Sequence, residues 1–123
     1  MFALRPHLVE GEWVEKVRRM QGGGYQLVFV GADGVVPSVA GFRFTEHLFW
    51  GSSLYIDDLS TLPEHRGKGY AGTLLDHLIA LARTRDCEQV HLDSGHHRHD
   101  AHRLYLNRGF RISSHHFSLK LLA

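Results

Sequence analysis

The stretch Arg66-Gly67-Lys68-Gly69-Tyr70-Ala71-Gly72 decides how this chain is organised. A mostly apolar run, Leu54 to Leu62, leads into it, and a helical pattern, Thr73 to Arg85, follows it. A glycine-rich turn that opens a helix gathers unpaired backbone N–H groups at the positive end of the helix dipole. Gly67 and Gly69 let a ligand approach the backbone closely, because no Cβ intervenes. With the two basic residues beside it, the turn is predicted to bind an anion such as a pyrophosphate.

Two better-known phosphate-binding loops fit this stretch less well. No Gly-x-x-x-x-Gly-Lys-Ser/Thr sequence occurs, which argues against a P-loop. Gly67, Gly69 and Gly72 do spell Gly-x-Gly-x-x-Gly after a strand, and Asp93 ends the next strand with an acidic residue, as in dinucleotide-binding domains. Only one further strand pattern follows, which is too few for the second half of that fold. The remaining alternative is a strand–turn–helix whose glycines serve geometry alone.

The same letters also read Arg-x-x-Gly-x-Ala, from Arg66 through Gly69 to Ala71. This pattern resembles the acetyl-CoA pyrophosphate loop of the GNAT superfamily of N-acetyltransferases. Downstream, Ala101 to Phe110 resembles that family's Ala-x-x-x-Tyr-x-x-x-Gly-Phe signature, with one helix and one strand between the two motifs. Two motifs in the right order are more specific than either alone. The resemblance covers roughly residues 35–121, most of the chain.

The resemblance implies that acetyl-CoA is the cosubstrate. The backbones of Leu59 and Thr61 would pair with its pantetheine arm like another strand, and a backbone N–H there would polarise the thioester oxygen. Many members carry an Asn that contacts the cofactor three residues before the helix alanine. This chain has Arg98 there, which is expected to reach a phosphate instead. The implied pyrophosphate-binding residues are Arg66, Gly67, Lys68, Gly69, Tyr70, Ala71 and Gly72.

Acetyl transfer to an amine needs an acid for the leaving thiolate and a base that keeps the amine neutral. The resemblance puts the family's thiolate-facing tyrosine at Tyr105; the alternative is a core tyrosine on an amphipathic helix. Leu54 to Leu59 resembles a strand of diamine acetyltransferases in which an acidic residue, nine before the loop arginine, acts on the amine through water. That position is Asp57. Asp93 matches the place of a catalytic glutamate in some ribosomal-protein acetyltransferases, and a mechanism without a protein base is the third alternative.

Asp57 is followed directly by a second carboxylate, Asp58. Successive side chains of a strand point to opposite faces of the sheet. The sequence therefore predicts that only one of these two carboxylates faces a given cleft.

Composition excludes several other classes of function. The 123 residues predict one acetyltransferase-like domain over residues 1–123. A net charge of +1 argues against nucleic-acid and membrane-surface partners. The single cysteine, Cys87, excludes an internal disulfide and a multi-cysteine zinc site. No apolar run is long enough for a membrane span, and the N-terminus lacks a signal pattern, so a cytoplasmic protein is expected.

Eleven histidines are the unusual feature of the composition. Zinc sites need further ligands at fixed geometry, and this histidine run sits partly in a loop. We therefore favour a polar loop that edges the cofactor or the acceptor, and predict no metal. The clustered histidines are His91, His96, His97, His99 and His102.

The alternation of strand and helix patterns predicts one central sheet. Asp33-Gly34 is a hairpin signal, Gly41 marks a bend, and Asp100 is expected to cap the last helix. The expected fold is an α/β (α+β mixed) fold: a GNAT-like central mixed sheet flanked by helices, without the family's usual first strand and first helix. Helices are predicted within Met1–Gln21 and at Thr73–Arg85 and Ala101–Arg108; strands are predicted at Tyr25–Gly31, Val35–Trp50, 54–62, Glu88–Ser94 and Phe110–Leu122.

These observations predict an acetyl-CoA-dependent N-acetyltransferase that moves an acetyl group to a small-molecule or peptide amine by direct attack. The alternative is a non-catalytic acyl-CoA-binding or regulatory module. The strand Tyr25–Gly31 would lack its usual neighbour, and exposed apolar strand edges invite pairing with another chain. A homodimer is therefore expected.

Overall fold

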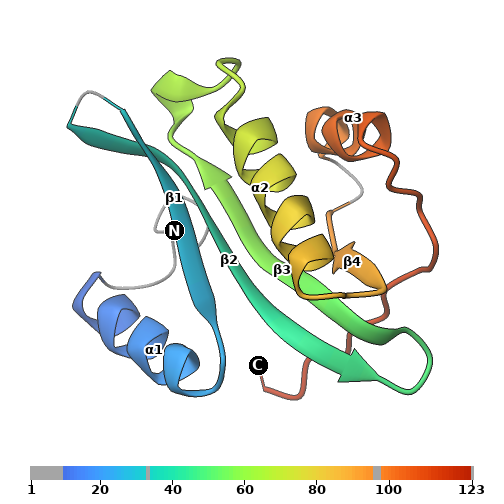
Figure 1. Ribbon diagram of the computed structural model, residues 1–123. Helices are drawn as coiled ribbons and strands as arrows, with labels where there is room; N and C mark the ends of the chain where they lie inside the picture. The colour runs from blue at the N-terminus through green and yellow to red at the C-terminus, as the bar shows by residue number, and fades with distance from the viewer. Residues whose placement is uncertain (1–9, 33, 96–97, 123) are drawn as a thin grey trace. The chain divides into compact units, whose positions relative to one another are not determined.

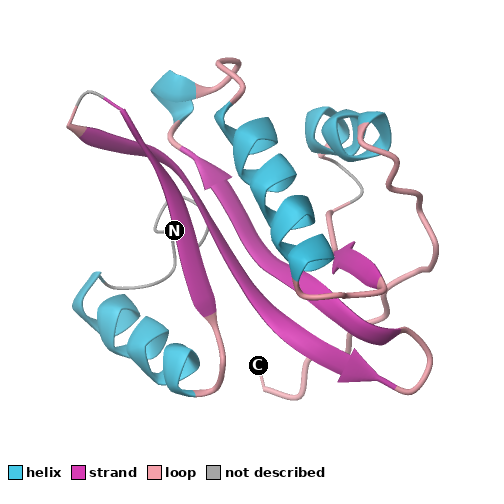
Figure 2. Cartoon of the chain, viewed as in Figure 1, coloured by secondary structure: helices cyan, strands magenta, loops and turns pink. Residues whose placement is uncertain are grey.

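The computed structural model describes residues 10–32, 34–95 and 98–122, without the side chains of residues 10–13 and 32 (Figures 1 and 2). The chain divides into two compact units, residues 1–92 and residues 93–123. Among the described residues, the first unit contains a four-stranded sheet and two α-helices, and the second contains one α-helix. The prediction of a single domain over residues 1–123 stays a prediction.

The sheet of the first unit has the order β1-β2-β3-β4. The pairs β1–β2 and β2–β3 are antiparallel, and β3–β4 is parallel, which confirms the predicted mixed sheet. One helix and no strand precedes β1 within the described residues, as the sequence led us to expect. The elements are α1 Glu10–Gly22, β1 Gln26–Ala32, β2 Val35–His47, β3 Gly51–Thr61, α2 Tyr70–Thr84 and β4 Gln89–Leu92.

Helix α2 packs against β2 and β3 and covers one face of the sheet (Figure 2). Its leucines recur at helical spacing, so one side of the helix is apolar and lies in the core. Burial of this apolar side stabilises the first unit. The core is formed by Ala40, Phe42, Leu54, Ile56, Leu74, Leu75, Leu78 and Ala82.

Turns with left-handed glycines connect the strands. Gly34, in the β1–β2 turn, has φ +77°, which suits a hairpin; its predicted turn partner Asp33 lies outside the described residues. Gly51, after the β2–β3 turn, has φ +71°. The carboxylate of Glu88 lies where a Cβ at Gly51 would stand, but the positive φ is what favours glycine here, because a glutamate side chain can move aside.

The pairing of β2 with β3 shifts its register once. Gly41 lies opposite Asp58, whereas the next residue, Phe42, lies opposite Ile56. Asp57 is therefore an extra residue in β3, which is a β-bulge. The predicted bend near Gly41 coincides with this bulge.

The second unit contains α3, His99–Asn107. The predicted cap was wrong, because Arg98 is the N-cap residue and Asp100 lies in the first helical turn. Helix α3 ends at a left-handed Gly109 (φ +90°), and the N–H of Phe110 donates to the carbonyl of Tyr105. The predicted terminal strand was also wrong: residues 110–122 adopt no strand, because a strand needs a ladder partner and no described residue supplies one.

Candidate active site

The predicted anion loop is an open turn between β3 and α2. It follows a short 3₁₀ turn, Pro63–His65. Gly67 and Gly69 have φ of +79° and +84°, a left-handed conformation that glycine adopts without strain. No described atom lies within 4 Å of the position that a Cβ would take at either glycine. The turn therefore has room for a ligand against its backbone.

Helix α2 begins directly after this turn, with Gly69 as its N-cap residue. No side chain caps the helix, and the N–H of Thr73 donates to the carbonyl of Gly69 at 3.0 Å. The first amides of a helix have no acceptor inside it. The amides of Tyr70, Ala71 and Gly72 are thus available, at the positive end of the helix dipole, to an anion.

The cations beside the turn are exposed. Arg66 and Lys68 are both exposed, and the Lys68 ammonium lies 3.5 Å from Nδ1 of His65. The ring of His65 in turn lies edge-on to Tyr70, with 6.2 Å between the ring centroids. Two cations and the helix amides suit a doubly charged group such as a pyrophosphate, so the residues present fit the phosphates of acetyl-CoA.

Strand β3 extends beyond the end of its parallel neighbour, β4. The parallel ladder with β4 ends at the pair Ile56↔Leu92, whereas β3 runs on to Thr61. Within the described residues no strand pairs with this side of β3 at Leu59 or Thr61. The open edge has the chemical character that the sequence prediction assigned to it: backbone N–H and C=O groups that an extended ligand can pair with.

The opposite edge of this segment is held firmly by β2. Ser38 donates to the carbonyl of Ser60 at 3.0 Å, and its hydroxyl lies 2.9 Å from the hydroxyl of Thr61. The N–H of Leu62 donates to the carbonyl of Pro37 at 2.8 Å. The end of β3 is therefore fixed on one side and open on the other.

At the bulge, Asp57 forms a two-pronged ion pair with Arg43. Nε of Arg43 donates to Oδ1 at 3.1 Å, and Nη2 donates to Oδ2 at 2.8 Å. A bidentate guanidinium–carboxylate pair of this kind is strong and fixes the orientation of both groups. The candidate base is thus oriented by a residue from the neighbouring strand.

Asp58 is bound by a residue that the sequence analysis did not select. The buried Tyr25 donates its phenolic O–H to Oδ2 of Asp58 at 2.7 Å. Burial, and then this hydrogen bond, raise the pKa of Tyr25 well above its usual value, so the phenol stays protonated. A Cβ at Gly41 would collide with the Tyr25 ring, so the phenol crosses β2 where the strand has no side chain.

The bulge changes the expected geometry of the two carboxylates. Alternation along a regular strand predicts that only one of the two carboxylates faces a given cleft, and this prediction was wrong. Cζ of Arg43 lies 5.5 Å from the centroid of the Tyr25 ring, and these two neighbours bind Asp57 and Asp58 respectively. The extra residue of a bulge turns its side chain away from the regular alternation, which lets both carboxylates join one cluster. Motif spacing could not reveal this, because alternation assumes an unbroken ladder.

The other predicted site residues lie in the second unit and are described within it. Tyr105 is buried, and burial raises its pKa while the nearby Arg98 opposes the shift. Its ring lies 6.0 Å from that of Phe110. Asp93 is exposed and lies 3.5 Å from Nδ1 of His116. The structure therefore divides the predicted residues between the two units.

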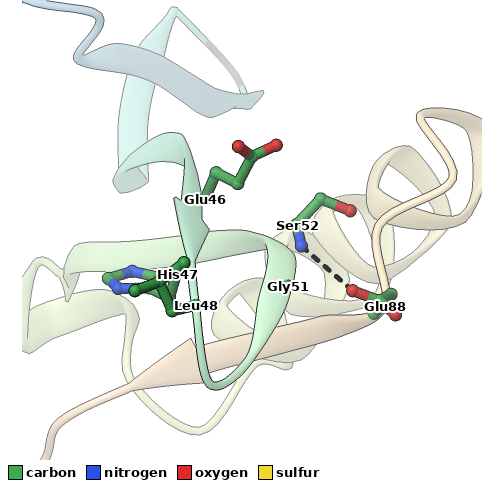
Figure 3. Close-up of a pocket in the computed structure, with 6 residues that line it drawn as sticks. All are labelled: Glu46, His47, Leu48, Gly51, Ser52 and Glu88. Carbon is green, nitrogen blue, oxygen red and sulfur yellow. Dashed lines mark hydrogen bonds between the residues drawn. The ribbon is translucent and has the colours of Figure 1, made fainter.

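A separate pocket lies at the β2–β3 hairpin, where β3 begins (Figure 3). In it the backbone N–H of Ser52 donates to Oε2 of Glu88 at 3.1 Å. No predicted site residue lines this pocket, and β3 runs from it toward the anion loop at its other end. Its lining residues are Glu46, His47, Leu48, Gly51, Ser52 and Glu88.

The histidines form no metal site in the described part of the chain. No group of three or more potential ligands was found there. The rings of His99 and His102 meet edge to face instead, and His102 lies within hydrogen-bond distance of the Gly95 carbonyl. His96 and His97 lie outside the described residues.

Comparison with known proteins identifies the class to which this fold and loop belong. Residues 3–110 match the acetyltransferase (GNAT) family. The match covers most of the chain, including both sequence motifs. The chain belongs to the GNAT family of acetyltransferases.

Two relatives and one solved structure agree with this assignment. The chain is 34% identical over 99 residues to an uncharacterized N-acetyltransferase, YhdJ, of Bacillus subtilis, covering 80% of this chain and 70% of that protein. It is 37% identical over 67 residues to streptothricin acetyltransferase of Streptomyces lavendulae, covering 54% of this chain but only 34% of that enzyme. A putative acetyltransferase from Agrobacterium tumefaciens has the same fold, with a TM-score of 0.81 at 24% identity over 97% of this chain and 87% of that chain.

Proposed function

We propose that this protein is an acetyl-CoA-dependent N-acetyltransferase that acts on a small-molecule or peptide amine. The phosphates of acetyl-CoA bind to the loop Arg66–Gly72, and the pantetheine arm pairs with β3 at Leu59 and Thr61. Arg98 of the second unit is proposed as a further phosphate contact. Family membership supports the activity.

One observation carries the proposal. The open edge of β3 leads within a few residues into the uncapped start of α2. An extended arm with a diphosphate at one end needs such a pair of features in succession: a strand edge for its amides and a helix start for its charge. The two features are held together by β2 and by the apolar side of α2.

Acetyl-CoA, when bound, supplies an acetyl group that is activated as a thioester. Backbone N–H groups at Leu59 and Thr61 are the candidates for stabilising the oxyanion that develops on it. Tyr105 carries its proton at neutral pH, as an acid that protonates a departing thiolate must, and burial raises its pKa further above neutrality.

Asp57 is the proposed base, acting on the amine through water. Its two oxygens accept hydrogen bonds from Arg43, and a carboxylate has further lone pairs for a water molecule. Asp93 remains the alternative, as does attack by an amine that reaches the site already neutral. The acceptor class, an amine, rests on the family alone.

Two measurements test the proposed function. Calorimetry should show binding of acetyl-CoA and CoA but not of NAD; binding of NAD without CoA would overturn the proposal. A panel of small amines and peptides should then contain an acceptor that releases free thiol from acetyl-CoA. Tight binding without thiol release across a broad panel would favour the non-catalytic acyl-CoA-binding module instead.

A further inference from the structure

Four residues from three neighbouring segments meet at the β3 bulge: Tyr25, Arg43, Asp57 and Asp58. Tyr25 immediately precedes β1, Arg43 is in β2, and the two carboxylates are in β3 (Figure 1). They are connected by a 2.7 Å phenol–carboxylate hydrogen bond, a two-pronged ion pair and the contact of the guanidinium with the phenol ring. We call these four residues the bulge cluster.

A bulge interrupts the ladder, so the backbone around it has fewer hydrogen bonds to define its shape. Here each of the two residues at the interruption has a side chain bonded to a neighbouring segment: Asp57 to Arg43, and Asp58 to Tyr25. Gly41 lies opposite Asp58 in the register and leaves the space through which the phenol reaches it. The side chains thus provide the constraints that the ladder does not.

The segment that follows the bulge is the open edge at Leu59 and Thr61. Because a bulge changes the direction and twist of its strand, its conformation sets where that edge lies. We propose that Tyr25 and Arg43 are positioning residues: acting through Asp58 and Asp57, they hold the bulge in the shape that aligns the Leu59–Thr61 edge with the acyl end of the cosubstrate. This inference rests on the proposed function of that edge.

The inference separates two kinds of binding. The adenosine and phosphate end of the cosubstrate is assigned to the loop after Thr61, whereas only the arm and the acyl group meet the edge. A change in the bulge cluster should therefore weaken the use of whole acetyl-CoA and leave binding of adenosine 3′,5′-bisphosphate, which lacks the arm, unchanged. A variant that merely unfolds the protein would lose both.

Tyr25→Phe is the first test variant, because it removes only the phenolic oxygen. We expect kcat/KM for acetyl-CoA to fall about 10- to 100-fold, the range for a small misplacement of reacting groups. Affinity for adenosine 3′,5′-bisphosphate, measured by calorimetry, should stay within about twofold of the wild type. This is roughly the effect of a substitution that disturbs no specific contact. Arg43→Gln should behave in the same way.

Thr45→Val is the matched control. The hydroxyl of Thr45 lies 2.8 Å from that of Ser53, so it bridges β2 and β3, as the Arg43–Asp57 pair does, but far from the open edge. It should lower the melting temperature by an amount similar to Tyr25→Phe and leave kcat/KM unchanged. If the control lost as much activity as the test variants, lost stability alone would explain their effect. That result would overturn the inference.

Non-additivity provides the decisive comparison. If Tyr25 acts through Asp58, Tyr25→Phe should have little further effect on kcat/KM in an Asp58→Ala background, which has no side-chain acceptor for the phenol. Hydrogen exchange of the Leu62 amide, which donates to the carbonyl of Pro37 just after β3, should also speed up in Tyr25→Phe and not in Thr45→Val. Unchanged kcat/KM and exchange in both test variants would overturn the inference while the proposed function stands. A wild-type protein that binds no acetyl-CoA would remove the proposed function itself, so the two failures are distinguishable.

Discussion

Tyr25 and Gly41 form a pair that no short motif contains. The phenol occupies the space that a side chain at Gly41 would fill, and it donates to Asp58 in the next strand but one. A buried hydroxyl needs such a partner, since an unsatisfied one costs about 1–3 kcal/mol. At the scale of single residues, the ionisation of Tyr25 therefore tests whether its phenol is buried and bonded to Asp58.

The raised pKa of Tyr25 predicts a loss of stability at alkaline pH. A tyrosine in the unfolded chain ionises near its ordinary value of 10.0, whereas the folded protein keeps the proton. The contribution of Tyr25 is fully present below pH 10 and is lost as pH rises toward the folded pKa, at up to about 1.4 kcal/mol per pH unit. Urea unfolding between pH 8 and pH 11 should show a steeper decline for the wild type than for Tyr25→Phe. Parallel declines would contradict the buried phenol, since the other tyrosines are common to both proteins.

Tyr105 predicts a change in rate rather than in affinity. The Tyr105 phenol is protonated at neutral pH, and burial raises its pKa further, so Tyr105→Phe removes a protonated donor. Turnover should fall by about 10²–10⁴-fold, with the KM for acetyl-CoA little changed. Steady-state kinetics with an identified acceptor are the measurement. Normal turnover would leave Tyr105 as a core residue of the second unit.

The base is identified by the pH dependence of its removal. Asp57→Asn should lower kcat/KM at neutral pH, and the loss should shrink as pH rises, because an amine that is already neutral needs no base. Rates measured from pH 7 to pH 10 on the wild type and the variant give the comparison. A loss that stays constant with pH would exclude Asp57 from this role, and the same series on Asp93→Asn would then follow.

At the scale of elements, the start of α2 combines a left-handed N-cap glycine with uncapped amides and exposed cations. Natural helix starts are usually capped by a side chain such as Ser, Thr or Asp. A glycine cap gives up only about a few tenths of a kcal/mol relative to the best caps, and it leaves the amides open to a ligand. The element is therefore better suited to binding than to stability.

Gly69→Ala should abolish binding of acetyl-CoA, because its methyl group blocks close approach to the backbone. The matched control is Gly34→Ala, in the β1–β2 turn: its φ is also positive, and open space surrounds it as well. Both substitutions should cost about 1–2 kcal/mol for placing a side chain in the left-handed region. Calorimetry should show normal binding for Gly34→Ala alone. Equal losses in both variants would mean that strain, not the ligand, explains the effect.

At the scale of the whole molecule, β1 is an edge strand of the described sheet. Its Phe29 is 62% exposed. Exposed strand edges with apolar side chains tend to pair with other chains, and pairing of two identical edges gives a two-fold symmetric dimer. None of the described helices is long and apolar enough to cross a membrane.

The dimer remains a prediction, and light scattering at micromolar concentration measures it. We expect a mass near twice the 14.0 kDa of one chain. Phe29→Lys should shift the mass toward one chain, because charged edge residues oppose pairing. Phe49→Lys is the control, since Phe49 is also exposed but lies in the β2–β3 turn. A wild-type mass of one chain that does not rise on concentration would defeat the dimer.

The sequence by itself determined the family and the order of the described elements apart from the terminal strand, and it predicted the anion loop. Local patterns carry this information: glycines with positive φ at Gly67 and Gly69, helical spacing in α2 and alternation in β4 depend on nearby residues only. The two motifs, around Arg66 and Tyr105, were recognisable for the same reason. The terminal strand failed because its pattern is local, whereas the partner that a strand requires is not.

Only the tertiary structure decided how the carboxylates of β3 are used. Asp57 and Asp58 are separated from Tyr25 and Arg43 along the chain, and their contacts exist only because three segments lie side by side with an interrupted register. No period in the sequence marks a bulge, since the extra residue is defined by what lies opposite it in another strand. The open edge at Leu59 is of the same kind, because it depends on where β4 ends and not on any residue of β3.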